Sequence, residues 1–471
     1  MQPDPALSVT RPWILKATMA RVLFALDLVL ALTAWPLMLW LARFDVVQSV
    51  GDPRALAYPV ADLLLLYAMG LYRREAFVEK RRSIARVPLV VGMGTVLATG
   101  IPAILTAANG QTDLLLPVLA FGGFTGSAFI ARFILDMLLG RRWLRRQLLV
   151  VGAGQRAWDL LRMLANEGAS LNYDITFLHD PVLGPADPRL EADPAATIVR
   201  GEGLCVLTAA RAVRADQIVI APDERRGMNL ERLLACKKAG FPVVQYLSFI
   251  EHEIRRVDIK RMELGWLVFS DGFYFGALDR VLKRGFDLIV SGAMLLLTGP
   301  LILAGIAAIR LEGRGPVFYR QERVTLDGEV FRIVKLRTMR VDAEAAGAVW
   351  AAARDTRITR AGLFLRRTRI DELPQLFNIL KGEMSFVGPR PERPVFVKDL
   401  TARIPLYPER HMVKAGLTGW AQVNYPYGAS VDDARSKLSY DLYYVKNFSI
   451  VFDCVILMQT LRAVLWPNGV R

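Results

Sequence analysis

The stretch 366–391, RRTRIDELPQLFNILKGEMSFVGPRP, combines an adjacent pair of acids with several arginines and a Gly-Pro-Arg-Pro turn. Its apolar residues have helical spacing, and Gly382 would end that helix, so Asp371 and Glu372 are expected at the helix start. Pro374 fits the first turn but lacks the N–H that a side-chain cap would use, which leaves the Asp371 carboxylate available for other chemistry. An ordinary helix cap is the alternative for an isolated acid pair.

The composition indicates a membrane protein. Of the 471 residues 53% are hydrophobic, the mean hydropathy is +0.30, and the net charge is +15. Apolar content and high charge seldom coincide in a soluble globule, whereas membrane spans with basic flanks account for both. Because the basic residues gather at the edges of apolar runs, no nucleic-acid partner is expected.

Four apolar runs fill the N-terminal third, at about 22–42, 55–71, 87–108 and 114–139. Each approaches the ~20 residues that a bilayer requires, although the second run carries Asp62. Basic residues precede the first run, separate the second from the third and follow the fourth, while 107–113 has none. Residues 1–140 are therefore predicted to form a four-helix transmembrane bundle with both ends in the cytoplasm. The first run is too long for a cleavable signal peptide.

Residues 141–277 are predicted to form a cytosolic Rossmann-like domain. An apolar strand leads into Gly152-x-Gly154-x-x-Ala157 and then into helically spaced leucines, the pattern of a dinucleotide-binding turn. Asp180 stands near the position of a ribose-binding acid. Gly152 and Gly154 are thus candidate cofactor-binding residues; the alternative is that they only allow tight strand-to-helix packing. Further strands are expected at 173–179, 217–221 and 241–247, and a helix at 230–239.

A fifth apolar run, about 285–309, is flanked by arginine and lysine on both sides, which conflicts with a simple crossing. Pro300 would cost ~3 kcal/mol or more inside a regular helix because it removes a hydrogen bond and clashes with the preceding turn. We therefore expect a re-entrant membrane helix that enters from the cytoplasm, bends at Gly299-Pro300 and returns. An ordinary kinked span is the alternative, and it would place the rest of the chain outside.

Two alternating stretches around Asp327-Gly328 predict a β-hairpin. In its second arm Lys335 and Arg337 are two residues apart and should project from one face toward a common partner. A solvated face or contact with anionic lipid is the alternative for any single cation.

Acids and cations in this arrangement suit phosphate chemistry. Two phosphate-bearing reactants repel each other by about 4 kcal/mol per unit-charge pair at 4 Å and an effective dielectric of 20, so cations such as Arg366 and Arg390 must offset this. Glu372 could hold Mg²⁺, and Asp371 could attack phosphorus to form an aspartyl-phosphate ester. A bent membrane segment nearby indicates a lipid phosphate as one reactant.

These residues resemble the bacterial polyprenyl-phosphate hexose-1-phosphate transferases, the monotopic type of phosphoglycosyl transferase. The resemblance covers about 278–471, an expected C-terminal α/β catalytic domain on the re-entrant helix. It rests on Lys335-Leu-Arg-Thr-Met, on 366–391, on Gly416-Leu-Thr-Gly-Trp-Ala-Gln-Val-Asn and on Tyr440-Asp-Leu-Tyr-Tyr-Val-Lys-Asn. The N-terminal parts resemble the large, extended subgroup. RIDELP, PERP and VNYPYGAS further resemble exosortase-associated exopolysaccharide sugar transferases.

The resemblance implies that Asp371 attacks the sugar-bearing phosphate of a UDP-sugar and releases UMP, while Glu372 helps bind Mg²⁺. Undecaprenyl phosphate then takes the sugar phosphate, which begins exopolysaccharide, capsule or O-antigen synthesis. The candidate substrate- and phosphate-binding residues are Lys335, Arg337, Arg366, Arg390 and Asp441. Gly299 and Ala415 replace a common serine and proline of the family, and Arg369 replaces a common serine near the acids.

The expected location is the bacterial inner membrane, with several spans and with both the catalytic and the Rossmann-like domain in the cytoplasm. Expected partners are the UDP-sugar, undecaprenyl phosphate, inner-membrane lipid, downstream glycosyltransferases and a second copy of the chain. The motifs do not specify which sugar is transferred.

Two other functions are alternatives to sugar-phosphate transfer. A membrane-tethered nucleotide-sugar dehydratase or epimerase needs a Tyr-x-x-x-Lys pair, and no lysine here follows a tyrosine by four residues. A nonenzymatic assembly scaffold is disfavoured by the intact acid pair. The three cysteines and three histidines show no zinc spacing, so reduced cysteines are expected. The last apolar stretch, 450–466, is expected to be a packed or interfacial helix.

Overall fold

The computed structural model describes residues 19–41, 53–106, 115–140, 144–194, 196–200, 205–224, 228–262, 271–273, 276–341, 357–426, 428 and 430–465. The chain divides into two compact units, Met1–Ile254 and Arg255–Arg471. The segment 107–113 and the end of the stretch 450–466, both used in the sequence predictions, lie partly or wholly outside the described residues.

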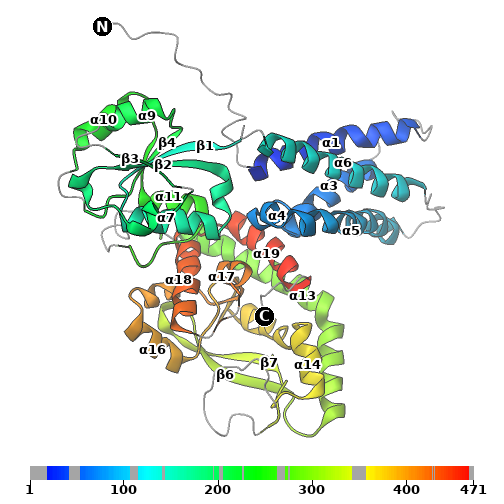
Figure 1. Cartoon of the computed structure of the whole chain (residues 1–471). Coiled ribbons are helices and arrows are strands. Elements are labelled where there is room, and N and C mark those ends of the chain that lie inside the picture. Colours follow the sequence, from blue (N-terminus) through cyan, green and yellow to red (C-terminus); the bar gives the residue numbers. More distant parts are fainter. Residues whose placement is uncertain are drawn as a thin grey trace. The chain divides into compact units, whose positions relative to one another are not determined.

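The first unit begins with apolar helices (Figure 1). They are α1 (Met19–Leu41), α3 (Pro53–Ala68), the short α4 (Arg74–Val78), α5 (Lys80–Thr106) and α6 (Leu115–Gly140). By length and composition α1, α5 and α6 can cross a membrane, whereas the second predicted run forms a shorter apolar helix at Ala57–Ala68. Helix α1 packs on α6, and α3 packs on α5.

Polar residues of this bundle face its interior. The Arg132 guanidinium lies 3.1 Å from the Asp27 carboxylate, and the Tyr72 hydroxyl donates to the same carboxylate at 2.8 Å. Asp62 is likewise buried. Charged groups in apolar helices are costly toward lipid, so this inward placement accounts for their presence in membrane-type sequence.

The rest of the first unit is a five-stranded, fully parallel sheet of order β3-β2-β1-β4-β5. Its strands are β1 (Arg146–Val151), β2 (Tyr173–His179), β3 (Thr197–Arg200), β4 (Gln217–Ile220) and β5 (Val243–Gln245). They alternate with α7 (Gln155–Asn166), η3 (Ala169–Asn172), η4 (Pro181–Leu183), α8 (Pro188–Glu191), α9 (Val206–Ala212), α10 (Leu230–Lys238) and α11 (Tyr246–Ile254). Parallel strands buried on both faces read as continuous apolar runs, as in residues 148–151 of β1.

The strands and helices of this sheet domain mostly lie where the sequence predicts them, with two differences. The last predicted strand, 241–247, is shorter, because Tyr246 already begins α11. Strand β3 was not predicted; it is four residues long and only partly buried, so it gives little periodic signal.

The second unit starts with α13 (Ala277–Glu312), a 36-residue apolar helix that contains Pro300. A hairpin follows, β6 (Phe318–Val324) and β7 (Val330–Leu336), joined through η5 (Leu326–Gly328). Asp327 and Gly328 have φ of +53° and +80°, the left-handed geometry that an Asp-Gly pair favours in a hairpin turn. The predicted hairpin is confirmed.

The remaining elements of the second unit follow the hairpin along the chain (Figure 1). They are α14 (Arg360–Arg367), η6 (Ile370–Glu372), α15 (Gln375–Lys381), β8 (Ser385–Val387), α16 (Pro394–Arg403), η7 (Tyr407–Met412), β9 (Gly416–Thr418), α17 (Trp420–Asn424), α18 (Val431–Lys446) and α19 (Ile450–Leu465). Buried Leu376, Ile379, Trp420 and Tyr444 join α15, α17 and α18 in one cluster. With α1, α5 and α6, helix α13 gives the described residues four helices long and apolar enough to cross a membrane. The chain is a membrane-associated α/β protein.

Candidate active site

The acid pair lies in η6, a short turn between α14 and α15, rather than within α15 itself. Arg369 begins this turn with φ of +59°, a left-handed conformation that non-glycine residues seldom adopt. Pro374 occupies the cap position of α15, and its side chain makes no capping hydrogen bond. Asp371 therefore does not cap α15, as predicted from the position of Pro374.

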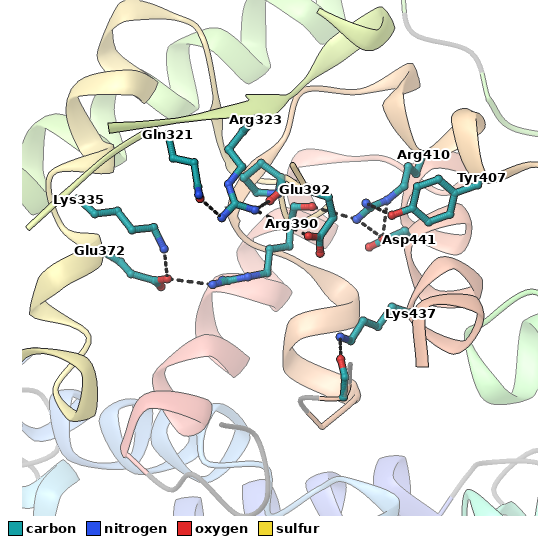
Figure 2. A network of polar contacts seen from close by, with 12 residues as sticks. Gln321, Arg323, Lys335, Glu372, Arg390, Glu392, Tyr407, Arg410, Lys437 and Asp441 are labelled. Atoms are coloured by element: carbon teal, nitrogen blue, oxygen red, sulfur yellow. Dashed lines mark hydrogen bonds and ion pairs between the residues drawn. The ribbon is translucent and has the colours of Figure 1, made fainter. Parts of the chain in front are cut away.

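Glu372 is held between two cations (Figure 2). Its Oε1 accepts from Lys335 Nζ at 2.8 Å and from Arg390 Nη2 at 3.0 Å, and Arg369 Nη1 lies 3.9 Å from Oε2. Burial raises the pKa of Glu372, but the charges of Lys335, Arg390 and Arg369 outweigh burial and hold that pKa well below its usual range. Glu372 is therefore a firmly ionised carboxylate.

Asp371 has a different environment. Its side chain is 8% exposed, and among the described residues its Oδ1 has no hydrogen-bond partner. Burial, together with the like charge of Glu372, raises the pKa of Asp371 to about 6, against the opposing charges of Lys335, Arg366 and Arg369. The surroundings thus shift the pKa values of two adjacent acids in opposite directions, an arrangement typical of sites where carboxylates have separate tasks.

The other predicted cations have two different placements. Arg366 is at the acid pair, where its charge acts on Asp371 and its Nε donates to Thr338 Oγ1 at 2.9 Å. Arg337 instead donates to the carbonyls of Arg314 and Gly313 at 3.2 and 3.4 Å.

The prediction that Lys335 and Arg337 share a partner is wrong. Strand β7 ends at Leu336, so its alternation no longer controls Arg337. The Arg337 guanidinium instead meets the carbonyls just beyond the carboxyl end of α13, where helices leave acceptors without intrahelical donors.

Asp441 lies behind the site and not in it. Asp441 is 2% exposed, and its carboxylate accepts from Arg410 Nε at 3.1 Å and Nη2 at 2.8 Å. Arg410 Nη2 also donates to the Arg390 carbonyl at 3.0 Å, and Nη1 donates to the Tyr407 hydroxyl at 2.9 Å (Figure 2). Among the described contacts, Asp441 is linked to Glu372 through Arg410 and Arg390. No sequence motif points to Arg410, because its partner Asp441 is 31 residues away.

The predicted nucleotide turn is occupied by the chain itself. The Asp223 carboxylate accepts from the backbone N–H groups of Gln155 and Arg156, at 2.5 and 2.9 Å, at the amino end of α7 where a dinucleotide phosphate would bind. A Cβ at Gly154 would overlap this carboxylate, and a Cβ at Gly152 would lie 2.6 Å from the Ala221 carbonyl. These contacts favour the packing alternative for both glycines.

Asp180, the candidate ribose-binding acid, accepts from Val182 N at 3.1 Å and caps η4. Its carboxylate thus has a local structural role at the end of β2.

A magnesium site at the acid pair would need ligands from a substrate. Across the described residues no group of three or more histidines, cysteines or acids is placed to hold a metal. Asp371 Oδ1 does have no hydrogen-bond partner there, beside the Glu372 carboxylate. Mg²⁺ is usually bound by one or two carboxylates together with substrate phosphates, so the two acids fit an ion shared with a phosphate group.

Comparison with known proteins identifies the family. Residues 278–467 match the family model described as bacterial sugar transferase. The chain is 39% identical over 200 residues to a UDP-glucose:undecaprenyl-phosphate glucose-1-phosphate transferase of Caulobacter vibrioides, covering 41% of this chain and 75% of that protein. The chain belongs to the bacterial sugar transferase family. The resemblance read from the motifs is thereby confirmed.

Two other relatives match this bacterial sugar transferase over only part of their own length. A UDP-N-acetylgalactosamine-undecaprenyl-phosphate N-acetylgalactosaminephosphotransferase of Aeromonas hydrophila is 42% identical over 266 residues, 55% of this chain and 61% of that protein. A UDP-glucose:undecaprenyl-phosphate glucose-1-phosphate transferase of Escherichia coli is 38% identical over 186 residues, 39% of this chain and 40% of that protein. The chain thus spans less than two thirds of either, and the names of the relatives differ in the sugar.

Proposed function

We propose that the chain transfers a hexose-1-phosphate from a UDP-sugar to undecaprenyl phosphate and releases UMP. The observation that carries this proposal is the difference between the surroundings of the two acids. Glu372 is ionised between Lys335 and Arg390, while the neighbouring Asp371 has a buried oxygen without a hydrogen-bond partner among the described residues. The names of the Caulobacter, Aeromonas and Escherichia relatives support the reaction class.

The transfer has two steps. First, a carboxylate oxygen of Asp371 attacks the sugar-bearing phosphorus, the phosphorus–oxygen bond to UMP breaks, and UMP leaves with the bonding electrons. Second, a phosphate oxygen of undecaprenyl phosphate attacks the same phosphorus, and the bond to Asp371 breaks. The product is undecaprenyl-diphospho-sugar, and the carboxylate is regenerated. Covalent catalysis of this kind avoids bringing both phosphate reactants together at once.

The cations around the acids have the task of offsetting phosphate charge. Lys335 and Arg390 share Glu372 Oε1, and a bound phosphate would offer them further acceptors. Arg366 adds a third positive charge beside Asp371. Mg²⁺ bound by Glu372, Asp371 and a phosphate oxygen would supply additional charge neutralisation.

We also propose that α13 is re-entrant, so that the acid pair lies at the cytoplasmic membrane surface. Both halves of α13 pack on the same unit: Val290 and Met294 join the core around α15, while Gly305 and Ile309 lie against Leu336 and Leu365. A straight helix of this length would be roughly 54 Å long, which makes contact of both halves with one small body difficult.

A bend in α13 has local support near its middle. Pro300 supplies no N–H to the helix, and the Thr298 hydroxyl donates to the Met294 carbonyl at 2.7 Å, a contact that often bends helices. Leu296 and Leu297 next to this region are 84% and 76% exposed, as lipid contact would allow.

The strand order of the parallel sheet is Rossmann-like, but it does not lead us to propose a nucleotide-dependent activity. A nucleotide-sugar dehydratase would use the amino end of α7 for its dinucleotide, and Asp223 fills that position. We therefore propose a structural role for this domain.

The proposal is tested with the purified chain, Mg²⁺, undecaprenyl phosphate and a panel of UDP-sugars. UMP release is expected with at least one sugar, and Asp371→Asn should abolish it. Release that is unchanged by this substitution would refute the role of Asp371, and the panel would identify the sugar.

A further inference from the structure

Two adjacent basic residues near the start of α13, Lys283 and Arg284, point into the second unit. From the sequence they are part of the positive flank of the fifth apolar run, a position typical of lipid headgroup contacts. In the structure both are only partly exposed, and each makes specific contacts with the catalytic unit. Arg280, one turn earlier on the same helix, is exposed.

Arg284 holds the carboxyl end of α15. Its Nη1 donates to the Ile379 carbonyl and its Nη2 to the Leu380 carbonyl, each at 2.6 Å. These carbonyls lie in the last turn, where a positive charge is favourable. The Ile379 carbonyl also accepts from the Gly382 N–H at 3.0 Å. Helix α15 begins three residues after Glu372, so Arg284 fixes the short helix that follows the acid pair.

Lys283 holds the other side of the site. Its Nζ lies 2.6 Å from the Asp453 carboxylate and donates to the Val387 carbonyl at 3.3 Å. The Tyr444 hydroxyl also donates to the Val387 carbonyl, at 3.0 Å. Val387 directly precedes the Gly-Pro-Arg-Pro turn that carries Arg390.

We propose that Lys283 and Arg284 are positioning residues through which α13 sets the distance between the acid pair and Arg390. This inference rests on the proposed function of the acid pair. Arg284 fixes the helix that follows Asp371 and Glu372. Lys283 fixes the strand end before the turn that brings Arg390 to Glu372. Because displacement of reacting groups by about 1 Å can cost about 10²-fold in rate, loss of either contact should slow the reaction without removing a substrate ligand.

The test compares Arg284→Ala with Arg280→Ala, which removes the same charge from an exposed position of the same helix. Both variants and the unaltered chain are placed in lipid nanodiscs, and UMP release, kcat and KM for the UDP-sugar are measured. Membrane association and melting temperature are recorded in parallel. For Arg284→Ala we expect kcat to fall about tenfold or more, with KM changed by about twofold at most. Arg280→Ala should leave both values unchanged.

Arg284→Lys keeps the charge but cannot donate from a planar fork to two carbonyls, so its kcat should be intermediate. This variant also serves if Arg284→Ala fails to fold. Equal effects of Arg284→Ala and Arg280→Ala, or a loss of kcat that follows loss of membrane association, would overturn the inference in favour of headgroup binding. Absence of UMP release from the unaltered chain would instead contradict the proposed function.

Discussion

Asp371 and Glu372 are chemically similar neighbours whose surroundings give them opposite properties. Lys335 and Arg390 stabilise the charge of Glu372, whereas burial and the charge of Glu372 disfavour a charge on Asp371. A phosphate-transfer site needs both kinds of acid, because one must stay ionised among cations while the other supplies an oxygen that is free to react.

The first prediction concerns the pH dependence of the reaction. Only the ionised form of Asp371 can attack phosphorus, and its pKa is raised to about 6. The value of kcat/KM for UMP release should therefore increase as pH rises through about 6 and then level off. Initial rates measured across this range with a saturating acceptor check the prediction. A rate that is flat between about pH 5 and 7 would contradict it.

The second prediction concerns stability. The pKa of Asp371 in the folded protein, about 6, is above its usual 3.8. Between these pH values the folded chain binds more protons than the unfolded chain, so its stability falls as pH rises. At neutral pH Asp371→Asn removes this penalty and should raise the free energy of unfolding by about 1–3 kcal/mol.

Glu372→Gln is the matched comparison for that stability measurement. The pKa of Glu372 is lowered, so its charge stabilises the fold above the usual carboxyl pKa. The substitution leaves Lys335 and Arg390 without their carboxylate. Thermal melts of the two variants at neutral pH should shift in opposite directions. Shifts in the same direction would show that the two acids are not held differently.

At the scale of elements, the amino end of α7 depends on Asp223. The third prediction is that Asp223→Ala lowers the free energy of unfolding of the first unit by about 1–2 kcal/mol, because two backbone N–H groups lose their acceptor. Added inorganic phosphate should recover part of the loss in this variant, since the vacated position suits an anion.

Asp180→Ala is the control for this prediction, because it removes a carboxylate from the end of β2 without touching α7. Melting temperatures with and without phosphate provide the measurement. Equal phosphate effects in the control and in Asp223→Ala would contradict a specific anion position at α7.

Local patterns predicted many of these elements, whereas distant pairings were missed. The β6–β7 hairpin follows from Asp327-Gly328, and α15 follows from helical spacing ended by Gly382. The partners of Asp223 and Arg410 are 68 and 31 residues away, and no spacing rule connects them. The acid pair was found because its residues are consecutive, but the positioning contacts behind it come from other elements.

For the whole molecule, the path of α13 decides on which side of the membrane the acid pair lies. The fourth prediction uses single cysteines in a chain whose own three cysteines are replaced. Arg280→Cys and Arg314→Cys lie before and after the apolar part of α13, and both positions are exposed. A re-entrant helix should make both react with a membrane-impermeant maleimide from the cytoplasmic side. Labelling from opposite sides would show a simple crossing.

The covalent step on Asp371 is the central claim, and a trapped intermediate tests it most directly. The purified chain is mixed with Mg²⁺ and its UDP-sugar without undecaprenyl phosphate, and digested peptides are examined by mass spectrometry. We predict a burst of UMP no larger than the amount of enzyme and a sugar-phosphate mass on the peptide that contains Asp371. A chain that completes the transfer when acceptor is present, yet releases no UMP and carries no such mass without it, would show that Asp371 forms no covalent intermediate.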